Sequence, residues 1–158
     1  MEMRQPRHII CAVRGGPESR ETVTQAIDLA LESSARLTFF RVLDAEFLNH
    51  ATIGPLSVVY RELNELGQFA MLILCDRAQR RGVQKVDGIV REGNVRRLLR
   101  EFAIETRAKI LVMGRPMRSP GSNTFKPADF DAYVAELEEE ANLYVKVVSP
   151  PQAKESED

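Results

Sequence analysis

The sequence predicts an α/β fold in which a parallel sheet is covered by helices on both faces. Five short apolar runs, rich in β-branched residues, alternate with four segments whose apolar residues recur at helical spacing. Several runs are apolar at consecutive positions, which is typical of strands buried on both faces. The segments between the runs are long enough for helices, so parallel strands with right-handed crossover connections are expected.

The strands are predicted at HIICAV (8–13), RLTFFRVL (36–43), VQKVDGIV (83–90), KILVM (109–113) and LYVKVV (143–148). Cys11, in the first run, and Cys75, in a helical segment, both lie among apolar residues. We interpret them as small buried residues rather than as a disulfide or reactive thiols. A ligand of such a sheet binds beyond the carboxyl ends of the strands, where the strand order reverses.

The first helix is predicted over 19–33, with Ser19 as its N-cap. Its apolar face consists of Val23, Ala26, Ile27, Ala30 and Leu31, at positions i, i+3, i+4, i+7 and i+8. Asn94 is placed to cap the third helix, whose apolar residues are Val95, Leu98, Leu99, Phe102 and Ala103. Pro127 lies near the start of the fourth, with Asp129 and Asp131 in its first turn and an apolar stripe of Phe130, Val134, Leu137 and Ala141.

The second helix is predicted to begin after Pro55 and to stop at Gly82. We expect its buried stripe to consist of Leu56, Val59, Leu63, Leu66, Ala70, Ile73 and Leu74, and its outer face to carry Arg61, Glu62, Glu65, Gln68, Asp76 and Arg77. At 1.5 Å per residue the segment from Leu56 to Arg81 would span about 39 Å, more than a small sheet needs. The surplus length is expected to project over the ligand crevice or toward a partner.

Composition and length place limits on the class of protein. Residues 1–150 are predicted to form one domain, followed by a polar tail, 151–158, that is expected to be disordered. The net charge of −1 gives no electrostatic case for binding a nucleic acid or an acidic membrane. The first ten residues lack the apolar core of a signal peptide, and no apolar run approaches ~18 residues. We therefore expect a cytoplasmic protein with no nucleic-acid or membrane partner.

The segments HIICAVRGGPES, SARLTFFRVLDA, VREGNVRRLLREFAIETRAKILVMGR and LYVKVVSP resemble successive landmarks of UspA-like domains of the universal stress protein family. The resemblance covers roughly residues 7 to 150. It implies a five-stranded sheet of order 3-2-1-4-5, of the adenine nucleotide alpha hydrolase-like type, with the switch point between strands 1 and 4. It also implies a homodimer formed through the last strand. Some family members bind ATP or AMP, and others bind no nucleotide.

The loop after the fourth strand departs from the pattern of the nucleotide-binding members. Those members resemble one another in a loop of the form G-x-x-G, nine residues, G-S/T. Gly114 matches the first glycine, but Met117 stands at the second, and only three residues separate Met117 from Gly121 and Ser122. Two prolines in this stretch also remove amide donors that a phosphate cradle would use. The resemblance therefore implies a shortened, altered loop.

The end of the first strand departs as well, because Arg14 stands where the nucleotide-binding members have an acid for the ribose hydroxyls. An arginine cannot accept those hydrogen bonds. Arg14, Arg115 and Arg118 are expected near the carboxyl ends of strands 1 and 4, with Arg91 at the end of strand 3. Guanidinium groups suit a phosphate or carboxylate, so the crevice remains a candidate site for an adenine nucleotide or another anion. Each arginine taken singly is also explained by a surface or ion-paired role.

The candidate binding residues lie around three strand ends. Val42 matches a family position that approaches the adenine through its backbone. The full set is Ala12, Val13, Arg14, Val42, Met113, Gly114, Arg115, Met117, Gly121, Ser122, Asn123 and Thr124.

No catalytic or metal-binding pattern is found in the sequence. His8 and His50 have no Cys or His at ligand spacing, and no serine has the context of a nucleophile. We therefore predict a non-catalytic stress-response or signalling module with no required cofactor. The alternative is an ATP- or AMP-binding stress protein that acts as a nucleotide-dependent switch, with at most slow hydrolysis.

Overall fold

The computed structural model describes residues 8–14, 19–44, 55–115 and 127–149. Its strands are β1 (His8–Ala12), β2 (Arg36–Asp44), β3 (Val86–Gly93), β4 (Ile110–Gly114) and β5 (Tyr144–Val148). They form one parallel sheet in the order β3-β2-β1-β4-β5. The predicted α/β class, parallel pairing and strand order are therefore confirmed. The tail at 151–158 lies outside the described residues.

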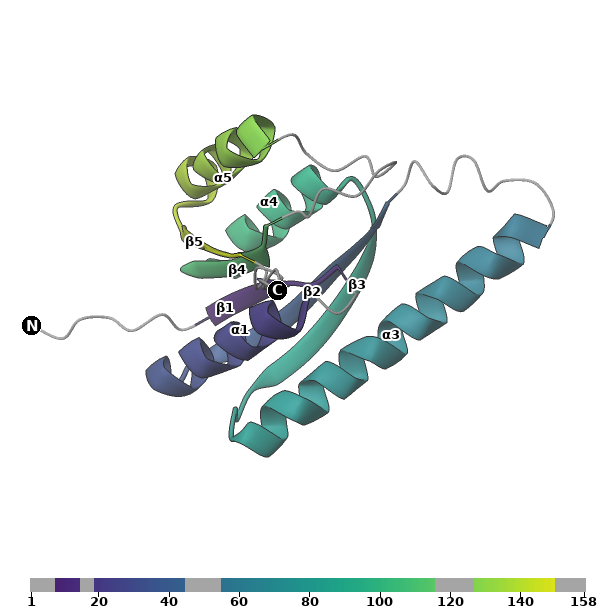
Figure 1. The fold of residues 1–158 in the computed structure, drawn as a ribbon, viewed down its shortest axis with the longest axis horizontal. Coiled ribbons are helices and arrows are strands. Elements are labelled where there is room, and N and C mark those ends of the chain that lie inside the picture. The colour runs from purple at the N-terminus through teal and green to yellow at the C-terminus, as the bar shows by residue number, and fades with distance from the viewer. Residues whose placement is uncertain (1–7, 15–18, 45–54, 116–126, 150–158) are drawn as a thin grey trace, which may run out of the picture.

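Helices cover both faces of this sheet (Figure 1). They are α1 (Ser19–Ser33), α3 (Pro55–Arg81), α4 (Val95–Thr106) and α5 (Pro127–Ala141). Successive strand residues point to opposite faces, so Ile9 packs toward α1 and α3 whereas Ile10 packs toward α4 and α5. Cys11 is fully buried in the first of these two clusters, and Cys75 packs half-buried at its edge, as predicted for small apolar residues.

The third strand is displaced from its predicted range, 83–90, to Val86–Gly93. Residues 82 and 83 complete the end of α3 instead: the Gly82 amide donates to Gln79 and the Val83 amide donates to Ala78. Gly82 has a φ of 113°, a conformation that glycine adopts readily. The ladder with β2 therefore starts at Val86, opposite Leu37.

The predicted buried stripe of α3 is wrong at two positions. Leu66 and Ile73 are 63% and 54% exposed, whereas Met71 and Ala78 are buried against the sheet. The reason is a close approach of α3 to β3 at Gly88, where an added Cβ would lie 2.7 Å from the Cβ of Met71. Leu74 and Cys75 also pack on this side, half-buried against the same cluster. The predicted outer residue Arg77 instead turns toward α1 and donates to the hydroxyl of Thr24 at 2.7 Å.

The length of α3 exceeds that of the sheet it covers. Its 27 residues span about 40 Å, whereas the 8 residues of β3 span about 26 Å. Because α3 runs opposite to the strands, its N-terminal part extends past their carboxyl ends (Figure 1). Among the described side chains of α3, the first buried position is Gly67, about 18 Å from the start of the helix. The predicted projection of this helix is thus present as one continuous element.

The start of α4 agrees with its predicted cap. The side chain of Asn94 accepts a hydrogen bond from the backbone N–H of Arg97 at 3.1 Å. The preceding residue, Gly93, has a φ of 149°, and a Cβ there would lie 2.8 Å from Leu98. This glycine lets β3 turn directly into α4 at the carboxyl edge of the sheet.

Candidate functional site

The candidate site lies at the carboxyl ends of β1 and β4, the central pair of the sheet. From β1 the chain crosses to β2 on one side, and from β4 it crosses to β5 on the other. This reversal of direction opens the sheet at the point where parallel α/β folds bind ligands. The structure brings the residues of 12–14 and 113–115 to this position, as the sequence predicted.

The last residue of β1 and the residue that follows it pack on opposite faces of the sheet. The Val13 amide donates to the carbonyl of Phe40 at 2.9 Å, which holds the chain beside β2 for one residue past β1. Val13 is buried against α1, and Ala12 packs at the edge of the cluster under α4 and α5. Arg14 stands where an acid is expected in the nucleotide-binding members, and its side chain is exposed.

The end of β4 is packed closely against α1. A Cβ on Gly114 would lie 3.0 Å from the hydroxyl oxygen of Thr22, a side chain that is only 3% exposed. Glycine at this position thus permits the first turns of α1 to approach the strand end. Its φ is not in the left-handed region, so close packing rather than an unusual turn explains the residue.

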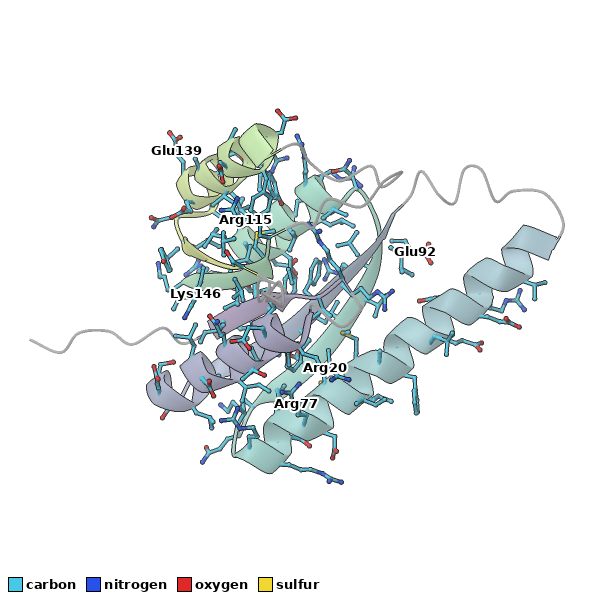
Figure 2. All side chains as sticks on the ribbon, viewed as in Figure 1. Arg20, Arg77, Glu92, Arg115, Glu139 and Lys146 are labelled. Atoms are coloured by element: carbon cyan, nitrogen blue, oxygen red, sulfur yellow. The ribbon has the colours of Figure 1, made fainter. Side chains whose placement is uncertain are left out.

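Arg115 extends from the same strand end toward α5. Its backbone N–H donates to the carbonyl of Val148 at 2.9 Å. Its guanidinium lies 3.6 Å from the carboxylate of Asp131 and 5.6 Å from the centre of the Phe130 ring. Figure 2 shows Arg115 on the α5 side of the sheet, away from Glu92 near the end of β3. These contacts give Arg115 a structural role where β4 meets α5.

Arg91, near the end of β3, makes the same two kinds of contact with α4. Its guanidinium lies 3.8 Å from Glu105 of α4 and 5.2 Å from the centre of the Phe102 ring. Arg91 and Arg115 therefore contact different helices rather than each other. Of the arginines considered in the sequence, Arg14 and Arg115 are the two in the described residues that lie at the switch point, and the guanidinium of Arg115 contacts Asp131 and Phe130 of α5.

An apolar cluster lies under α4 and α5, beside the carboxyl ends of the central strands. Val42 lies opposite Arg91 in the β2–β3 ladder and packs at the edge of the cluster that includes Met113 and Phe102. The ring of Phe102 stacks on that of Phe40, with centroids 4.5 Å apart and planes 11° apart. Phe40, Phe102 and Met113 are thus part of the core, and Val42 is a half-buried residue at its margin.

Several predicted site residues lie outside the described residues: Met117, Gly121, Ser122, Asn123 and Thr124. Arg118 lies in the same segment. Their contribution to the crevice stays a prediction.

A polar cluster that the sequence reasoning missed lies at the opposite, amino-terminal edge of the sheet. Thr38 donates to Asp87 at 2.6 Å, and Nε2 of His8 lies 2.7 Å from the same hydroxyl. Arg36 also pairs with Asp87, at 2.8 Å. The signal available in the sequence was polar residues inside otherwise apolar strand runs. Burial and the charge of Arg36 lower the pKa of His8, while Asp87 acts in the opposite direction.

Within the described ranges, no group of three or more His, Cys, Asp or Glu residues is arranged to hold a metal ion. None of the helices in those ranges is long and apolar enough to cross a membrane.

Comparisons with known proteins agree with this geometry. The family model described as the universal stress protein family matches residues 6–125. Among solved structures, the chain is similar to universal stress protein UspA from Lactobacillus plantarum, at 18% identity and a TM-score of 0.71, with 93% of this chain and 99% of that chain covered. A protein of the universal stress protein family from Burkholderia pseudomallei matches at 22% identity and a TM-score of 0.61, covering 90% and 95%. A universal stress protein in complex with cAMP matches at 20% identity and a TM-score of 0.59, covering 92% and 98%. A comparison with curated proteins found no match.

Proposed function

Because the chain belongs to the universal stress protein family, we propose that it is a non-catalytic stress-response or signalling module with an altered nucleotide crevice. The proposal takes residues 1–150 as a single domain that acts in the cytoplasm. Protein partners would bind to its surface. The observation that carries the proposal is Arg14, exposed at the switch point between β1 and β4.

The chemistry of Arg14 argues against the binding mode of the nucleotide-binding members. An acid at the end of β1 would accept hydrogen bonds from the ribose hydroxyls, whereas a guanidinium is a donor only. The shortened loop after Gly114, with Met117 at the second glycine position, would offer fewer amides to a triphosphate. Both differences weaken contacts to the ribose and to the phosphates of a nucleotide.

The second candidate is a nucleotide-dependent switch that binds ATP or AMP. The structure in complex with cAMP is a relative at 20% identity and supports this alternative. The half-buried Val42 and the closely packed Gly114 would retain part of such a site. In this version Arg14 would pair with a phosphate of a nucleotide bound in a different pose, or with another small anion.

Calorimetric titration distinguishes the two candidates, using ATP, ADP, AMP and cAMP with the wild-type chain and with Arg14→Asp. The altered-crevice proposal predicts no heat and no thermal shift for wild type at millimolar ligand, and no adenine absorbance released on denaturation. Saturable binding by wild type that is lost in Arg14→Asp would establish the switch instead. Arg20→Asp, in the exposed first turn of α1, is the matched control for the change in net charge.

Activity is tested separately, by incubating the chain with ATP and measuring the release of ADP. The proposal predicts release no faster than in buffer. A rate proportional to protein concentration, and retained by independently purified preparations, would contradict the non-catalytic assignment.

We also propose a homodimer formed through β5, the edge strand next to β4. Tyr144 is 59% exposed on this strand, and an apolar edge strand is prone to pair with another chain. A two-fold pairing of β5 would cover the edge in both copies.

A further inference from the structure

The outward face of α3 carries apolar side chains that the fold does not use. Leu66, Phe69 and Ile73 are 63%, 61% and 54% exposed. Phe69 and Ile73 are each two residues from the buried Met71, which places them about 200° around the helix from it. The exposed apolar face is therefore nearly opposite the face that packs on the sheet. This surface shares no residue with the candidate site or with the β5 edge.

The exposed residues follow the spacing of a coiled-coil seam. Steps of four and three residues alternate through Glu62, Leu66, Phe69, Ile73, Asp76 and Arg80, and all of these residues are exposed. We call this set the α3 seam. Alternation of this kind keeps one stripe facing a partner helix through several turns. The seam runs for about 27 Å along the helix.

The charges at the two ends of the α3 seam indicate the occupant. Glu62 stands at one end and Arg80 at the other, with Leu66, Phe69, Ile73 and Asp76 between them. In a parallel pair of α3 helices each charge would meet its own copy, which is unfavourable. In an antiparallel pair, Glu62 of each copy would face Arg80 of the other, and Phe69 would face Ile73. Leu66 would face Asp76, whose carboxylate is already paired with Arg80 of its own helix. Two of the three kinds of facing pair are therefore complementary in the antiparallel orientation, whereas a parallel pair would bring three pairs of like charges together.

We propose that α3 binds α3 of a second copy of this chain as an antiparallel two-helix coiled coil. Arg80 already pairs with Asp76 of its own helix, at 2.9 Å. A Glu62 from the second copy would complete an acid–base–acid group at each end of the contact. By two-fold symmetry each of these contacts occurs twice.

The shape of the chain permits this approach. The N-terminal part of α3, which includes Glu62, extends past the strands (Figure 1). Toward its C-terminal end the helix is fixed in rotation by Arg77, which bonds Thr24, and by Arg81, which pairs with Asp28 at 2.8 Å. The seam is therefore presented on one continuous helix whose C-terminal part is held against α1.

The test measures mass by sedimentation equilibrium across a concentration series, in a Val147→Pro background that blocks pairing through β5. The proposal predicts a reversible dimer. Phe69→Glu should convert it to a monomer, with an unchanged circular dichroism spectrum because Phe69 is exposed. Failure to dimerise in this background overturns the proposal, and leaves the exposed face to a partner of another kind.

Charge reversal tests the orientation. Glu62→Arg alone and Arg80→Glu alone should each raise the dissociation constant about tenfold or more, and the double exchange should restore much of the affinity. Glu139→Arg, on the exposed face of α5, changes the net charge equally and should have no effect. A dimer that is sensitive to Phe69→Glu but not rescued by the double exchange would overturn the antiparallel arrangement. None of these outcomes depends on whether the crevice binds a nucleotide.

Discussion

Gly88 of β3 lies so close to Met71 of α3 that an added Cβ would stand 2.7 Å from the Cβ of Met71. The contact is between backbone-proximal atoms, so rotation of a flexible side chain cannot relieve it. It fixes both the distance of α3 from the sheet and the face of the helix that turns inward. We predict that Gly88→Ala lowers the free energy of unfolding by about 1–3 kcal/mol, measured by urea denaturation. An unchanged midpoint would contradict this packing.

Gly67 provides the opposite case on the same helix. A Cβ at Gly67 would lie 3.7 Å from the guanidinium of Arg41, an ordinary van der Waals contact. Gly67→Ala should therefore raise the free energy of unfolding by about 0.5–1 kcal/mol, because alanine loses less conformational freedom than glycine in a helix. The same urea titration measures it. Destabilisation would show that α3 is packed more tightly at Gly67 than these distances indicate.

Gly114 and Thr22 are predicted to be energetically coupled. Gly114→Ala would place a Cβ 3.0 Å from the hydroxyl oxygen of the buried Thr22. We expect this change to cost about 1 kcal/mol in the wild type and less in a Thr22→Ala background, where that oxygen is absent. Urea denaturation of the two single variants and the double variant gives the coupling energy. Strict additivity would contradict direct contact between strand end and helix.

His8 is predicted to make stability depend on pH. Its pKa is lowered in the folded chain, first by burial and then by Arg36. Protonation therefore favours the unfolded chain, so the contribution of neutral His8 is present above pH about 6.5 and is lost as pH falls through and below that value. His8→Gln should have a smaller loss of stability between pH 7.5 and 5.5 than wild type. Equal losses in both proteins would remove His8 as the cause.

The open edge of β5 offers a specific test of dimerisation. Tyr144 donates to Lys109 and Val148 accepts from Arg115, so the backbone groups of Val147 point away from β4. Val147→Pro removes an N–H from the open edge without removing a bond to β4. In a Phe69→Glu background we expect this change to convert a dimer to a monomer by light scattering. Val147→Thr keeps the N–H and should remain dimeric.

The alternation of apolar runs and helical stripes was sufficient to predict the order of elements and the parallel sheet. Boundaries were less predictable where one element passes directly into the next. The run at 83–90 combined the end of α3 with β3, because valine at position 83 satisfies an apolar pattern in either setting.

The orientation of α3 could not be read from its pattern because the helix has two apolar stripes. The stripe with larger residues, including Leu66, was expected to face the sheet, but Gly88 admits a close approach that suits Met71 and Ala78. Likewise, the sequence predicted that Arg115 follows the end of β4, but it could not predict where the guanidinium points. Its neighbours Asp131 and Phe130 come close only when α5 packs on the sheet.

The strand order places β3, with α3 beside it, at one margin of the sheet and β5 at the other. A subunit with a two-fold contact at each margin has a limited choice of assemblies. If the two symmetry axes intersect at a right angle, four subunits close into a ring-like particle with no unused contacts. Axes that intersect at certain smaller angles close into larger particles, whereas axes that do not intersect repeat the contacts without closing and give a filament whose length grows with concentration.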